Sequence, residues 1–103
     1  MRQEQAAEKI HPKLLFALES ARMRFSVAIA MEAKSTSRDR WMYYLETTDR
    51  MGRFIKRLRR TDFEIQMDPR GWDQALERLR NLPDQGRASG LCEILRNIVA
   101  ELE

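Results

Sequence analysis

The chain contains few of the residues that interrupt helices or cross-link small folds. Of its 103 residues, only 3 are proline and 4 are glycine, and β-branched residues are also scarce. These absences favour helix along most of the chain. The single cysteine, Cys92, excludes an intramolecular disulfide framework. A lone cysteine favours a reducing setting, so we expect a cytoplasmic protein.

The sequence also lacks a long hydrophobic run. The first ten residues are polar and charged, so we expect no secretory signal there. The most apolar stretch, residues 14–31, is interrupted by Glu19, Arg22 and Arg24. Because ionised side chains are costly inside a bilayer, this pattern argues against a transmembrane helix. We therefore expect no membrane partner.

Residues that build catalytic and metal sites are equally scarce. His11 is the only histidine, and beside Pro12 its expected role is to cap the first helix. Cys92 follows Leu91 in a predicted helix, which is typical of a small buried side chain. The sequence has no glycine-rich phosphate loop and no metal-ligand spacing. We predict that the protein is not an enzyme and has no catalytic residues, metal or cofactor.

The apolar periodicity predicts a first long helix from about Pro12 to Lys34, after a flexible lead-in over residues 1–11. The main apolar stripe consists of Leu14, Leu18, Ala21, Phe25, Ala28 and Ile29. A second apolar set consists of Phe16, Met23, Val27 and Ala30. A helix that is apolar on two faces is normally buried between neighbours. We expect either the central helix of a bundle or a helix that presents one face to another chain, as in a homodimer.

A second long helix is predicted over residues 38–60, with Thr36 or Ser37 as its N-cap. The short connection indicates an antiparallel hairpin. The apolar stripe of this helix consists of Trp41, Tyr44, Leu45, Met51, Ile55 and Leu58. Thr48 and Gly52 lie four residues apart on the buried side. Their small size predicts a close approach of the two helices there.

After residue 60 the pattern changes. Apolar and polar residues alternate over residues 61–68, which predicts an extended link; pairing with the same segment of a second copy is the alternative. Asp68 and Pro69 form the start of a third helix, which ends before Pro83. A fourth helix begins near residues 88–90. The sequence therefore predicts an all-α fold: a single-domain bundle of about four helices over residues 1–103, two long and two short.

Charge is unevenly distributed along the chain. Residues 38–60 carry eight basic and three acidic side chains, whereas residues 61–103 carry five basic and nine acidic ones. At roughly 100° per residue, Arg50, Arg53 and Arg57 share an arc of about 80° with Arg60. Guanidinium groups arranged in this way are typical of a surface that binds anions. The same face could instead pair with the acidic final third of its own chain or of a second copy.

We predict a partner-binding surface on this basic helix. Its candidate residues are Arg50, Arg53, Lys56, Arg57, Arg60, Met42, Tyr43 and Phe54. Exposed methionine and aromatic side chains beside arginine are typical of interface hot spots. An ordinary helix surface explains the arginines equally well, because Glu46 and Asp49 precede Arg50 and Arg53 by four positions and favour helical ion pairs.

These patterns favour a small non-enzymatic helical binding protein, of the adaptor, regulator or inhibitor type, that docks its basic face on an acidic surface of a protein partner. The alternative is a nucleic-acid backbone binder with little sequence specificity, which would use the same arginines on phosphates. A helix-turn-helix protein needs a recognition helix with polar or basic residues. The fourth helix, the natural candidate, instead carries Glu93, Glu101 and Glu103 and only Arg96 as a basic residue. A third hypothesis is a structural subunit whose basic helix pairs with the acidic third of a second copy.

Overall fold

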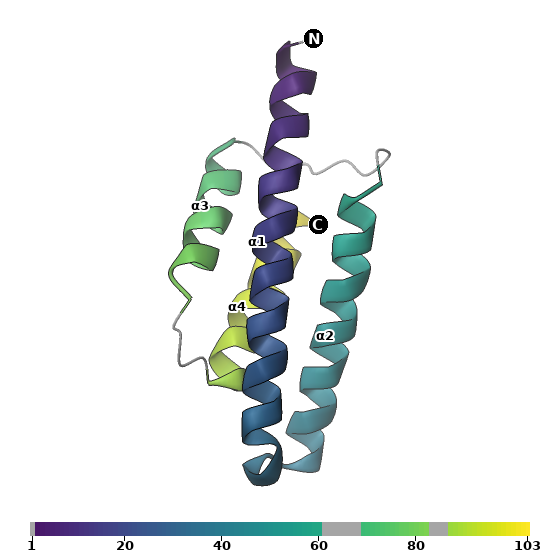
Figure 1. Ribbon diagram of the computed structural model, residues 1–103, viewed down its shortest axis with the longest axis vertical. Coiled ribbons are helices and arrows are strands. Elements are labelled where there is room, and N and C mark those ends of the chain that lie inside the picture. Colours follow the sequence, from purple (N-terminus) through teal and green to yellow (C-terminus); the bar gives the residue numbers. More distant parts are fainter. Residues whose placement is uncertain (1, 61–68, 83–86) are drawn as a thin grey trace.

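The computed structural model is a bundle of helices that run alongside one another (Figure 1). It describes residues 2–60, 69–82 and 87–103, and the side chains of residues 12–60, 70–82 and 87–103. The elements are α1 (Arg2–Glu32), the 3₁₀ turn η1 (Ala33–Ser35), α2 (Arg38–Leu58), α3 (Pro69–Arg80) and α4 (Ala88–Leu102). The predicted all-α, four-helix architecture is therefore confirmed. The extended link predicted over 61–68 lies outside the described residues.

α1 begins at Arg2, so the lead-in predicted over residues 1–11 is helical from Arg2 onward. Pro12 lies inside the helix instead of at its start. Proline removes one backbone hydrogen bond there. The preceding residues 3–9 are mostly Gln, Glu, Ala and Lys, which have high helix propensity. The helix therefore continues on both sides of the proline.

α1 is the central helix, and it packs against α2, α3 and α4. The whole predicted main stripe of α1 is buried, with exposed fractions between 0% for Leu14 and 7% for Ala28. Phe25 meets Tyr44 of α2 edge to face, with ring centroids 5.7 Å apart and planes at 80°. Apolar side chains of α3 and α4 complete the core around this pair. The predicted inner stripe is thus confirmed.

α1 and α2 form the predicted hairpin (Figure 1). The Ser37 hydroxyl caps α2, because its oxygen accepts a hydrogen bond from the Arg40 backbone N–H at 3.3 Å. The Thr36 hydroxyl donates to the Glu32 carbonyl oxygen at 2.6 Å. These two local hydrogen bonds satisfy backbone groups in the short connection between α1 and α2.

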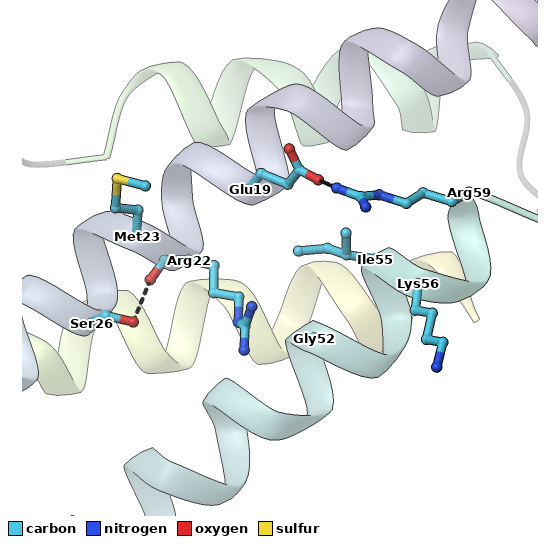
Figure 2. Close-up of a pocket in the computed structure, with 8 residues that line it drawn as sticks. All are labelled: Glu19, Arg22, Met23, Ser26, Gly52, Ile55, Lys56 and Arg59. Atoms are coloured by element: carbon cyan, nitrogen blue, oxygen red, sulfur yellow. Dashed lines mark hydrogen bonds and ion pairs between the residues drawn. The ribbon is translucent and has the colours of Figure 1, made fainter.

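Gly52 makes room for an arginine instead of a close contact between helix backbones, so that prediction is corrected. The side chain of Arg22 extends from α1 toward Gly52 (Figure 2), and a Cβ atom at Gly52 would lie 3.0 Å from its Nη2 nitrogen. The Arg22 Nε donates to the Thr48 carbonyl oxygen at 3.2 Å. The small residue therefore leaves space for a side chain that bridges α1 and α2.

Long-range hydrogen bonds fix the positions of the two short helices. Glu32, at the end of α1, accepts a hydrogen bond from the Ala88 backbone N–H at 3.0 Å and so satisfies one free donor at the start of α4. Arg24 donates to the carbonyl oxygen of Leu82, just after α3, at 2.7 Å. Both contacts start from α1, which therefore organises the bundle. In the part of the chain that the structure describes, no helix is long and apolar enough to cross a bilayer.

Candidate docking surface

The predicted basic face of α2 is partly neutralised by acidic residues. Glu103, just after α4, accepts from Arg50 at 3.4 Å and from Arg57 at 3.3 Å. Arg53 pairs with Asp49 at 3.3 Å, as the spacing of four predicted, whereas Arg50 turns to Glu103 and not to Glu46. Part of this face therefore meets the acidic final third of the same chain. Because these ion pairs are solvent-exposed, they contribute little to stability, of the order of 0–1 kcal/mol each.

The apolar edge of the predicted surface is only partly exposed. Phe54 is 1% exposed and belongs to the core, so the expectation that it edges the basic face is wrong. Leu45, expected in the core, is 43% exposed. Met42 and Tyr43 are 57% and 46% exposed, as predicted. α2 packs against α4 as well as α1, so its buried side includes Phe54 and leaves Leu45 exposed.

A buried polar cluster, which the sequence did not indicate, lies where α2 meets α4. Thr47 is fully buried, and its hydroxyl donates to the Tyr43 carbonyl oxygen at 2.9 Å while accepting from Arg96 at 2.9 Å. The same oxygen lies 3.1 Å from the Cys92 sulfur. The Arg96 guanidinium also stacks over the Tyr43 ring at 4.4 Å. The Arg96 side chain is therefore held by its contacts with Thr47 and Tyr43 of α2.

Cys92 is almost completely buried, as expected for a small apolar side chain. Burial raises the pKa of its thiol above 9.0, and the hydrogen bond to Thr47 and the charge of Arg96 only partly oppose that effect. The unfolded chain therefore releases this proton at a lower pH than the folded one. The stability linked to the thiol is fully present below the unfolded pKa and is lost as the pH rises through the folded pKa.

We therefore expect the free energy of unfolding to fall as the pH rises above about 9, by at most about 1.4 kcal/mol per pH unit from this group. Urea unfolding of the native chain and of Cys92→Ala between about pH 8 and pH 10 measures the effect. Because other groups titrate equally in both proteins, the native chain should lose more stability than the variant. An identical pH dependence in the two proteins would contradict the assignment.

The second apolar set of α1 is not covered by the described part of the chain. We call Phe16, Met23, Val27 and Met31 the outer ridge. These side chains are 73%, 70%, 55% and 82% exposed, respectively. Their spacing of seven, four and four residues keeps them on one side of the helix. The central helix therefore buries one apolar face in the bundle and exposes the other.

Two grooves flank the outer ridge. The groove between α1 and α2 is lined by Met23 and Ile55 together with Arg22, Lys56 and Arg59 (Figure 2). Arg59 pairs across it with Glu19, whereas the partner of Arg22 is a neutral carbonyl group, which leaves the positive charge uncancelled. Lys56, one of the predicted site residues, is exposed at this edge.

The other groove lies between α1 and α3. Its apolar lining includes Phe16 and Leu76, and its charged lining is Lys13, Arg24 and Arg80. The residues that line the two grooves thus include six basic side chains and one acidic one, Glu19. Most of these basic residues were not recognised in the sequence, because they come from three different helices and form no local pattern.

The arrangement offers apolar contact area and positive charge. Among the described residues, no group of three histidine, cysteine or acidic side chains could hold a metal ion. Comparisons with protein-family models, with curated proteins and with solved structures gave no match to this chain. Function is therefore argued from the surface alone.

Proposed function

We propose that this protein is a non-enzymatic helical binding protein, of the adaptor, regulator or inhibitor type, that docks on an acidic surface of a protein partner. The outer ridge of α1 carries the proposal: four large apolar side chains are each more than half exposed on one helix face. Apolar surface that is contiguous and rimmed by polar residues is typical of protein interaction sites. The ridge would supply the area buried on binding.

Basic residues support an acidic partner. Arg22 and Lys56 lie in the groove between α1 and α2, and Lys13 and Arg80 lie in the groove between α1 and α3. Such a field raises the rate at which an acidic partner associates and fixes its orientation. Of the predicted binding set, Phe54 is excluded because it is buried, and Met42 and Tyr43 on α2 lie outside the proposed surface, which is centred on α1.

The nucleic-acid alternative has weaker support. A backbone binder needs cations that are free to replace counterions on phosphates, yet Arg50, Arg53 and Arg57 contact carboxylates of this chain. Phosphate binding also gives no reason for an exposed apolar ridge. The crosslinking experiment below distinguishes a nucleic-acid partner from a protein partner.

A photo-crosslinking amino acid at position 23 of the full chain, in the cells that make the protein, tests the proposal. We expect a protein adduct that is absent when the same group replaces Asn97, an exposed residue of α4. Adducts with nucleic acid alone would favour the alternative. Adducts only between copies of this chain would favour the structural subunit, and equal adducts at both positions would overturn the proposed surface.

A further inference from the structure

The outer ridge has the length and shape to accept a second helix. From Phe16 to Met31 the ridge covers fifteen residue steps, or about 22 Å at 1.5 Å per residue. One groove borders the ridge at Met23 and the other borders it at Phe16, on opposite sides. Packed helices fit the side-chain ridges of one into the grooves of the other. A partner helix can therefore place its apolar side chains on both sides of the ridge.

Other modes of peptide recognition fit this surface less well. The described residues form helices and short connections only, so within them there is no strand edge to which an extended peptide could add a strand. A polyproline segment needs a groove lined by aromatic side chains, and within the described part of the chain Phe16 is the one aromatic residue that lines these grooves. A helix laid in a groove is the mode that remains.

The charges beside the ridge specify what the partner helix carries. Among the described residues, six basic side chains and one acidic side chain line the two grooves. The acidic one, Glu19, is already paired with Arg59. Two copies of this surface would place like charges face to face, which disfavours association. An acidic partner meets the opposite charge on both sides.

Two of the arginines are also held in place before any partner binds. Arg22 donates to the Thr48 carbonyl oxygen and Arg24 to the Leu82 carbonyl oxygen. Because a carbonyl is neutral, the bond to Thr48 orients the Arg22 guanidinium group without removing its charge. Side chains that are already ordered lose less entropy on binding. The groove between α1 and α2 is therefore preorganised for a carboxylate.

We infer that the occupant of this surface is an acidic amphipathic helix of the protein partner. Its apolar face lies along the outer ridge, and the carboxylates that flank this face contact the basic residues of the two grooves. This inference rests on the proposed function, and it names the chemistry of the partner segment. It also moves the centre of the interface from the outer side of α2 to α1.

A designed peptide pair tests the chemistry. The first peptide is a labelled, end-blocked helix of about five turns, with leucines on one face, glutamates on both sides of that face and alanines elsewhere. The second carries lysine in place of every glutamate. In fluorescence anisotropy with the full chain, we expect the acidic peptide to bind at least about tenfold more tightly, since each 1.4 kcal/mol of difference is a factor of ten. The difference should shrink as salt is added.

Matched variants test the location. Met23→Glu places a carboxylate on the outer ridge, and Met42→Glu makes the same change on the outer side of α2. Both methionines are more than half exposed, so circular dichroism should show unchanged helicity. We expect Met23→Glu to weaken binding of the acidic peptide at least about tenfold and Met42→Glu to change it less than about twofold.

The inference would be overturned if the acidic peptide did not bind, or bound no better than the lysine peptide. It would also be overturned if Met42→Glu weakened binding as much as Met23→Glu, or if the chain eluted as a dimer that Met23→Glu dissociates, since a second copy would then occupy the ridge. Binding of phosphatidylcholine and phosphatidylserine vesicles through Met23, without binding of the acidic peptide, would overturn it as well. If a protein adduct formed at position 23 in cells but the acidic peptide did not bind, the proposed function would stand and the acidic helix would be excluded as the partner segment.

Discussion

Replacing Phe25 with alanine is expected to lower the free energy of unfolding by about 3–5 kcal/mol. The side chain is fully buried in the middle of α1, and its ring meets the Tyr44 ring edge to face. Because α1 packs against the three other helices, the backbone around the lost ring cannot collapse freely. Domains have a total stability of about 5–15 kcal/mol, so the variant should lose a large fraction of its stability. Urea denaturation followed by circular dichroism measures the change.

Phe16→Ala is the matched control. Phe16 lies on the same helix and is 73% exposed, so we expect a change within about 0.5 kcal/mol. Equal losses in the two variants would contradict the arrangement described, since they would mean that the outer ridge is buried in solution. A small loss in Phe25→Ala would contradict the central position of this side chain in the core.

Ala75→Asp is expected to detach α3 from the bundle. Ala75 is fully buried, and α3 packs chiefly on α1, as Figure 1 shows. An unpaired carboxylate in such an interface costs several kcal/mol, about 3–5 when no partner compensates it. Because α3 has few contacts outside α1, local release of this helix relieves the cost while α1, α2 and α4 stay together. Trp72, which is 7% exposed in α3, reports the release.

The measurement is the emission maximum of Trp72 in a Trp41→Phe background, which leaves one tryptophan. Ala75→Asp should shift the emission to longer wavelength, as expected for a ring that enters water, with only a modest loss of helicity. Gln74→Asp places the same carboxylate on the exposed neighbouring residue and should leave the emission unchanged. A red shift in both variants, or complete unfolding in Ala75→Asp, would contradict this view of α3.

Local rules predicted most of the helices and their inner faces. The spacing of Leu14, Leu18 and Phe25 depends only on 3.6 residues per turn, and all three side chains are buried as expected. The capping by Ser37 and the start of α3 at Pro69 likewise follow from neighbouring residues. The start of α1 differed, because the residues before Pro12 have high helix propensity and the helix includes the proline.

The candidate site was predicted less well, for a physical reason. The stripe of α2 is wide, and the positions of its neighbours decide which edge is covered. Phe54 and Leu45 therefore exchanged their expected places. The contacts of Arg50 and Arg57 with Glu103 join residues about fifty positions apart. Periodicity carries no information over such a separation.

The sequence by itself determined an all-α bundle with a doubly apolar first helix, because propensity and periodicity act over a few residues. It also showed an excess of basic charge on the second helix. Only the tertiary structure decided which apolar face of α1 stays exposed, since that depends on where α2, α3 and α4 pack. The gathering of basic side chains from α1, α2 and α3 along the outer ridge was decided in the same way, because residues distant in sequence become neighbours only when the helices associate.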